Sequence, residues 1–108
     1  MRGAIVVTEI GGPEVLKWVG RDPGDPGPSE ALVRHTAVGL NFIDVYHRTG
    51  LYPVDLPFTP GVEGTGVVEA VGDGIDDLSV GDRVAYTSNG PIGSYCEARV
   101  LPRARLVA

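Results

Sequence analysis

Four polar residues that stand close together in the sequence could bind a polar ligand and its cofactor. They are Asn41, Asp44, Tyr46 and Tyr52. Two phenols, an amide and a carboxylate supply hydrogen-bond donors as well as acceptors. A structural interpretation competes with this one, because Asn41 is a good helix cap and Asp44 a typical first-turn acid. The tyrosines would then only pack against the wall of the fold, and the spacing alone favours this second interpretation.

The two histidines and the single cysteine are weaker candidates for chemistry. His35 falls on the apolar face of an expected strand, where a lone imidazole is typical of a hydrogen-bonded core residue. His47 is expected to face solvent on a short helix. Cys96 alternates inward with Ala98 and Val100, and no neighbour in sequence would clearly activate its thiol. We therefore interpret Cys96 as a small buried hydrophobic residue.

Glu63 lies in a glycine-rich segment, residues 60–66, where its carboxylate could ligate a metal or hold the backbone. The neighbouring residues 64–69 read GTGVVE and nearly match the dinucleotide-binding fingerprint. The match fails because the last position is Glu69 instead of glycine. It also fails because the segment opens a strand, whereas the fingerprint must open a helix. We therefore exclude a phosphate-binding loop here.

Length and composition exclude several classes of protein. The 108 residues suit one domain, and 16 glycines with 9 prolines exclude a helical bundle. A net charge of −5 argues against a nucleic-acid partner. No apolar run approaches the roughly 20 residues of a membrane span, and the N-terminal apolar stretch is too short for a signal peptide. One cysteine permits no intrachain disulfide, which predicts a cytoplasmic protein, and with two histidines it argues against a metal site rich in nitrogen and sulfur.

Frequent glycine and proline turns separate short runs of strand character, which predicts a mainly β fold, either a barrel or a sandwich. The expected strands cover residues 3–8, 15–19, 31–40, 64–71, 83–87 and 94–101. One helix is expected, from Phe42 to about Thr49, with Asn41 as its cap and Gly50 at its end. The helix is expected to pack on the β fold through an apolar stripe of Phe42, Val45 and Tyr46. The segment 72–81 is expected to be a solvated loop.

Several segments together resemble the N-terminal domain of NADPH:quinone oxidoreductases, the zeta-crystallin-like, zinc-free branch of the medium-chain dehydrogenase/reductase superfamily. The segments are residues 11–16 (GGPEVL), 37–46 (AVGLNFIDVY), 50–53 (GLYP), 60–72 (PGVEGTGVVEAVG) and 80–84 (VGDRV). They occur in the order of that family and run essentially from end to end of the chain. The GEG and GDRV pieces alone mark only the superfamily.

The resemblance implies a GroES-like, partly open β-barrel with one or two short helices, formed by residues 1–108 as the catalytic, substrate-binding domain. The Rossmann cofactor domain of the family is absent from this chain and becomes its expected partner. In zinc-dependent relatives, a cysteine holds the place of Asn41 and a histidine that of Val62. Because both ligands are replaced here, the resemblance implies a metal-free site.

The reaction that the resemblance implies is hydride transfer from NADPH to a quinone or a related conjugated carbonyl. It places Asn41, Phe42, Tyr46 and Tyr52 beside the cofactor, with both tyrosines also lining the substrate side. Asp44 would orient this group of catalytic residues. With one wall of the cleft missing, the chain alone is expected to be inactive.

Two other readings stay open. The chain could be a stand-alone GroES-like module that binds a protein or small molecule without catalysis. It could also associate with itself, because the cleft wall that a cofactor domain would cover is expected to be apolar and bare.

Overall fold

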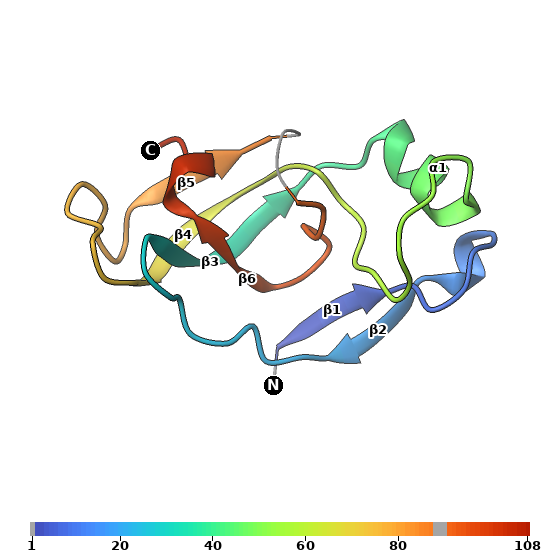
Figure 1. Ribbon diagram of the computed structural model, residues 1–108, viewed down its shortest axis with the longest axis horizontal. Helices are drawn as coiled ribbons and strands as arrows, with labels where there is room; N and C mark the ends of the chain where they lie inside the picture. Colours follow the sequence, from blue (N-terminus) through green and yellow to red (C-terminus); the bar gives the residue numbers. More distant parts are fainter. Residues whose placement is uncertain (1, 88–90) are drawn as a thin grey trace.

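The computed structural model describes residues 2–87 and 91–108, and its strands form two antiparallel sheets (Figure 1). The smaller sheet pairs β1 (Gly3–Val6) with β2 (Lys17–Gly20). The larger sheet has the order β5-β4-β3-β6. Its strands are β3 (Glu30–Val38), β4 (Gly64–Val71), β5 (Arg83–Tyr86) and β6 (Ala98–Pro102). The predicted strand 64–71 is confirmed at both ends, whereas the others begin or end one to four residues away from their predicted limits.

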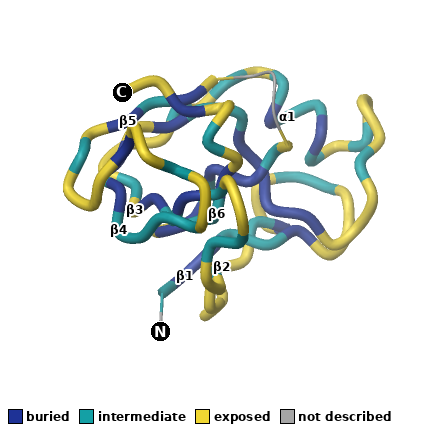
Figure 2. The backbone as a smooth tube through the Cα atoms, turned by 60° about the vertical axis from the view of Figure 1, so that its left-hand side comes forward, coloured by how far each residue is buried: buried dark blue, intermediate teal, exposed yellow. Residues whose placement is uncertain are grey.

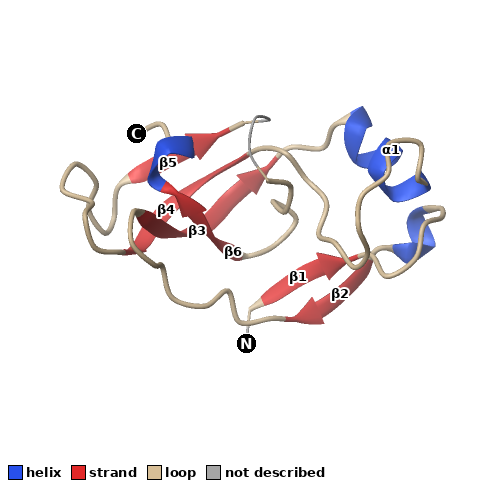
Figure 3. Cartoon of the chain, viewed as in Figure 1, coloured by secondary structure: helices blue, strands red, loops and turns tan. Residues whose placement is uncertain are grey.

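Isolated β-bridges connect β1 and the residue after it to loop segments, and the two sheets do not form one continuous barrel. Ala4 in β1 pairs with Cys96, and Val7 pairs with Phe58. The Ile5 N–H also donates to the Tyr95 carbonyl oxygen at 2.8 Å. Figure 3 shows the smaller sheet lying beside β6, with α1 at the same end of the molecule as the turn that follows β1. The prediction of a mainly β, partly open fold is therefore confirmed.

The main core lies on one face of the larger sheet. It also includes a residue of the loop before β5 and a residue of the C-terminal segment. Its buried members are Ala31, Val33, Val68, Leu78, Val84, Tyr86, Leu101 and Leu106. A smaller cluster of Val7, Val15 and Phe58 lies under the turn that follows β1. Burial of these side chains is the main favourable term that holds the short strands together. Along β3 and β4, buried positions alternate mainly with half-buried ones (Figure 2).

The alternation predicted for residues 94–101 is wrong beyond Ala98. Leu101 is the buried residue at the end of β6, and Val100 is only half-buried. The register explains this, because Leu101 pairs with the buried Ala31 of β3 and so shares its core-facing side. The apolar face of β3 that carries His35 ends at this residue, since the register shifts between His35 and Ala37, and Ala37 is exposed.

The helix α1 (Phe42–Thr49) has the predicted limits, with Asn41 as N-cap and Gly50 ending it in a left-handed conformation at φ 86°. Its predicted apolar stripe is wrong at Phe42, which is 79% exposed. The buried residues of α1 are Asp44 and His47, so the prediction that His47 faces solvent is also wrong. The polar face turns inward because Asp44 finds hydrogen-bond donors there, as described below.

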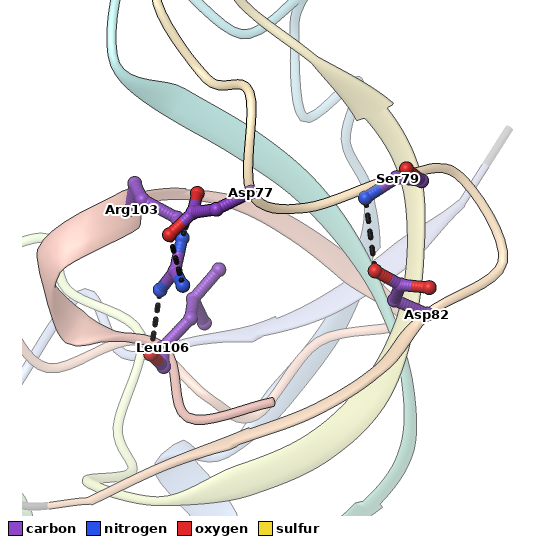
Figure 4. A network of polar contacts seen from close by, with 5 residues as sticks. All are labelled: Asp77, Ser79, Asp82, Arg103 and Leu106. Atoms are coloured by element: carbon purple, nitrogen blue, oxygen red, sulfur yellow. Dashed lines mark hydrogen bonds and ion pairs between the residues drawn. The ribbon is translucent and has the colours of Figure 1, made fainter.

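Two short 3-10 helices complete the secondary structure. The first, η1 (Pro13–Val15), occupies the start of a predicted strand, because Pro13 at its beginning favours a helical turn. The second, η2 (Arg103–Arg105), follows β6 and is tied to the loop that precedes β5 (Figure 4). Arg103 makes a two-pronged ion pair with Asp77, at 3.0 and 2.9 Å, and donates to the Leu106 carbonyl oxygen. Within the described part of the chain, no helix is long and apolar enough to cross a membrane.

Candidate functional site

The helix α1 and the loop after it bring the two predicted site tyrosines together. The ring centroids of Tyr46 and Tyr52 lie 5.2 Å apart, with an angle of 71° between the planes. This edge-to-face arrangement is a favourable one for aromatic rings. The Tyr52 N–H donates to the Tyr46 carbonyl oxygen at 3.2 Å, which fixes the loop against the helix. Tyr52 is 51% exposed, so solvent and ligands can reach this pair.

Asp44 is buried and holds the start of α1 in place. One carboxylate oxygen, Oδ2, accepts from the Asn41 N–H at 3.0 Å and from the Tyr95 hydroxyl at 2.7 Å. Burial and this carboxylate together raise the pKa of Tyr95 far above its ordinary value, so its hydroxyl stays protonated and keeps donating. The Asp44 carboxylate therefore bonds to other residues of the chain and links α1 to the segment before β6.

Sequence reasoning missed Tyr95 as a partner of the site residues. Tyr95 stands 51 positions from Asp44, and neither residue belongs to a motif that would link them. No signal in the single sequence could have found this pair, because their contact depends on how α1 packs against the strands.

The side-chain amide of Asn41 has an unused hydrogen-bond donor. Its Nδ2 atom is buried and, among the described residues, finds no hydrogen-bond acceptor. A buried amide nitrogen without a partner is unfavourable and uncommon in native proteins. The Asn41 amide could thus donate to a bound carbonyl without breaking an existing bond of its Nδ2 atom.

An exposed apolar surface flanks these residues. Leu40 is 81% and Phe42 79% exposed at the start of α1, and Leu51 is 63% exposed beyond its end. Large apolar side chains exposed together are typical of a surface that contacts a ligand or another part of a protein. The predicted site residues therefore border a surface that lacks a cover in this chain.

A groove of about 430 Å³ lies next to this surface. It runs along the end of β3 from His35 to Leu40, and Trp18 and Cys96 lie among its other lining residues. None of the predicted site residues lines it, although Leu40 directly precedes Asn41. Asn41 and the two tyrosines thus lie outside this groove, with Tyr52 exposed and with Asn41 and Tyr46 half-buried.

His35 is a structural residue, as predicted. Its Nδ1 lies 2.8 Å from the Cys96 carbonyl oxygen, and its Nε2 lies 2.6 Å from the Tyr86 hydroxyl. A carbonyl oxygen only accepts, so Nδ1 carries the proton and Nε2 accepts from Tyr86 in the neutral ring. Burial lowers the pKa of His35 and raises that of Tyr86, so both groups stay uncharged.

The stability of the fold is expected to fall in mild acid because of His35. The unfolded ring binds a proton with a pKa near 6.5, whereas the folded ring binds it only at lower pH. The unfolded state then holds more protons, and the free energy of unfolding falls below about pH 6.5 by up to about 1.4 kcal/mol per pH unit. Urea denaturation between about pH 7.5 and pH 5.5 measures this slope. His35→Gln should flatten it, and an unchanged slope in that variant would contradict the assignment.

Cys96 and the glycine-rich segment also behave as predicted. Burial raises the pKa of the Cys96 thiol, which is 8% exposed and donates to the Gly93 carbonyl oxygen. The GTGVVE segment lies inside β4, which agrees with its exclusion as a phosphate loop. The Glu63 carbonyl oxygen accepts from the Gly39 N–H at 3.3 Å. Among residues 2–87 and 91–108, no group of three or more His, Cys, Asp or Glu could hold a metal ion.

Comparison with known proteins places this chain in a family. The alcohol dehydrogenase GroES-like domain matches residues 27–108. A quinone oxidoreductase of Pseudomonas aeruginosa is 54% identical over 99% of this chain, which spans 33% of that protein. A 2-haloacrylate reductase of Burkholderia is 40% identical over 96% of this chain, which spans 32% of that protein.

A solved structure gives the same result. The crystal structure of Escherichia coli quinone oxidoreductase complexed with NADPH matches 97% of this chain with a TM-score of 0.92 and 39% identity. The chain spans 32% of that structure, about a third of the length of the relatives that it matches. The resemblance to the N-terminal domain of quinone oxidoreductases is confirmed by these matches. The chain therefore belongs to the alcohol dehydrogenase GroES-like domain family.

Proposed function

We propose that this chain forms the substrate-binding wall of an NADPH-dependent reductase that acts on quinones or related conjugated carbonyls without a metal. The observation that carries the proposal is the 54% identity of the chain to a quinone oxidoreductase, and the Tyr46–Tyr52 pair and the unpartnered Asn41 amide support it. The matched 2-haloacrylate reductase supports the wider substrate class, since its name also describes a conjugated carbonyl compound. A cofactor domain would form the other wall, because the chain spans only about a third of its relatives.

The residues present fit a nicotinamide cofactor. The buried Nδ2 of Asn41 lacks an acceptor, which a carboxamide oxygen would provide. Phe42 is 79% exposed and offers an apolar ring against which a flat heterocycle can lie. NADPH, when bound, supplies the hydride, and the protein supplies orientation and electrostatics. The amide at 41 and the aliphatic side chain at Val62 offer no zinc ligand at these two positions.

The tyrosines and Asp44 have different tasks in this proposal. The hydroxyls of Tyr46 and Tyr52 donate hydrogen bonds to the substrate carbonyl oxygen, where negative charge develops during reduction. The final proton comes from solvent, which reaches the half-exposed Tyr52. Asp44 is a positioning residue, because its carboxylate fixes the backbone of Asn41 and touches neither ligand.

The proposal predicts the activity of a reassembled enzyme. We expect the chain joined to a cofactor domain of a matched quinone oxidoreductase to oxidise NADPH with a quinone, and the 108-residue chain alone to lack this activity. Asn41→Ala and Tyr52→Phe should each lower kcat/KM by at least about tenfold, since each removes one hydrogen bond to the reacting groups. The absorbance of NADPH follows the reaction.

Tyr86→Phe is the matched control for Tyr52→Phe. It removes a hydroxyl that bonds His35 in the core, so it should lower stability and leave kcat/KM unchanged below the unfolding temperature. An assembly that binds NADPH but reduces no quinone or conjugated carbonyl would favour a binding module without catalysis. Equal loss of activity in the Tyr52 and Tyr86 variants would remove the assigned role of Tyr52.

A further inference from the structure

A cavity of about 440 Å³ lies apart from the candidate site and carries an unusual charge. It forms where the ends of β1 and β2 meet the segments 57–59 and 92–93 and the side chain of Arg99. Arg21 and Arg99 line it, and no acidic residue does. The chain as a whole has a net charge of −5. A cavity lined by two arginines and no acidic residue is therefore unlike the rest of the chain, in which acidic residues outnumber basic ones.

Arg99 is only partly satisfied by the protein. Its Nη2 donates to the carbonyl oxygens of Pro91 and Ile92, at 3.2 and 3.3 Å. Its guanidinium carbon lies 5.6 Å from the centre of the Tyr86 ring, a cation–π contact that holds the group in place. Its Nη1 is buried and finds no acceptor among the described residues. A fixed, buried donor on a charged group is unfavourable unless an acceptor reaches it.

Arg21 points to the same place from the end of β2. Its Nη1 donates to the Thr59 hydroxyl at 2.8 Å, and Thr59 is buried. The Thr59 oxygen accepts this bond, which leaves the hydroxyl hydrogen able to donate to a ligand. The neighbouring Asp22 accepts from the Gly24 N–H and makes no ion pair with Arg21. No ion pair forms at Arg21 or Arg99 with any residue of the described ranges.

The two guanidinium groups act on one common neighbour, the Cys96 thiol. Burial raises the pKa of Cys96, and both Arg99 and Arg21 oppose this rise through their positive charges. Both charges are therefore felt at one buried atom. Two like charges held near one another destabilise the fold unless an anion lies close to them.

We propose that this cavity binds a small organic carboxylate, held by the guanidinium groups of Arg21 and Arg99. A carboxylate presents only acceptors in one plane, which suits the planar donor edge of arginine and the unpartnered Nη1. The remaining walls include Val6, Phe58 and Ile92, which would pack against an apolar body attached to the carboxylate. The site shares no residue with the proposed quinone site.

Titration of the 108-residue chain with benzoate tests this proposal, with benzamide and inorganic phosphate as comparison probes. Benzoate should raise the unfolding temperature and bind saturably by calorimetry, because a ligand that binds only the folded state stabilises it. Benzamide has the same body without the charge, and phosphate has charge without an apolar body. We expect both to bind at least about tenfold more weakly than benzoate.

Arginine variants locate the site. Arg21→Gln should raise the dissociation constant for benzoate by about tenfold or more, and Arg105→Gln should leave it unchanged, because Arg105 is exposed in η2. Arg99→Gln should raise the dissociation constant at least as much. If loss of the Tyr86 contact unfolds the Arg99→Gln variant, the result for Arg21→Gln alone tests the proposal. Absence of benzoate binding, binding that Arg21→Gln leaves unchanged, or equal binding of benzamide would each overturn the proposal. Tighter binding of phosphate than of benzoate would also overturn it.

Discussion

Asp44→Asn should lower the free energy of unfolding by about 3 kcal/mol, because it replaces a carboxylate oxygen that accepts two hydrogen bonds within a buried cluster. Asp44 is 4% exposed, and its Oδ2 accepts from the Asn41 N–H and from the Tyr95 hydroxyl. The neutral amide keeps the shape of the side chain and one acceptor oxygen, but it loses the charge that strengthens both bonds. It also places an NH2 group at the buried Oδ1 position, where no acceptor lies among the described residues. Urea denaturation at neutral pH measures the difference.

Tyr95→Phe separates the two bonds of this cluster. It removes the hydroxyl bond and leaves the bond to Asn41, so it should cost about half as much, on the order of 1.5 kcal/mol. The double variant should cost less than the sum of the two, because both substitutions remove the same Tyr95–Asp44 bond. Strict additivity, or a loss below about 1 kcal/mol in Asp44→Asn, would show that the cluster does not hold α1 in place.

Gly66→Ala should destabilise the fold by about 3 kcal/mol, because the added methyl group has no room between β4 and β3. Gly66 pairs with His35 in β3. A Cβ at this position would meet the Arg34 backbone carbonyl and the Val33 side chain at less than contact distance. The obstacle is backbone of the neighbouring strand, so the two strands would have to separate. Thermal unfolding should show the loss as a lower Tm.

Thr65→Ala on the same strand is the control for this effect. Thr65 is exposed, and its hydroxyl makes only an exposed contact with Thr36 at 3.3 Å, so the change should cost below about 0.5 kcal/mol. Similar losses in the two variants would indicate that β4 tolerates side chains at position 66. The expected contrast gives a structural reason for the glycine, whose place in the GTGVVE segment first invited comparison with a phosphate loop.

Local signals in the sequence were sufficient for several elements. The turn residues and β-branched runs predicted β4 with its observed limits. The Asn41 cap and Gly50 predicted the ends of α1, because caps act through bonds within one turn of helix. The isolated imidazole on an apolar strand face correctly predicted a structural His35, and the segment order predicted the family.

The face of α1 that turns inward could not be predicted in this way. Periodicity assigned Phe42 to the core, but the fold exposes Phe42 and buries Asp44 and His47. The reason is the Tyr95 hydroxyl, which reaches Asp44 from a segment 51 positions away. The pattern of a single sequence shows which positions are apolar. It does not show which hydrogen-bond donor from a distant segment will reach a given polar side chain.

The sequence by itself determined the strand-rich composition, the one helix with its caps, and the residues that resemble a quinone reductase. Only the tertiary structure decided that Tyr46 and Tyr52 meet edge to face, that Asp44 works inside the protein, and that Arg21 and Arg99 share one cavity. The physical difference is one of range. Backbone propensity and capping act between neighbours along the chain, whereas the Asp44–Tyr95 bond and the cavity of Arg21 and Arg99 form only when segments far apart in sequence pack together.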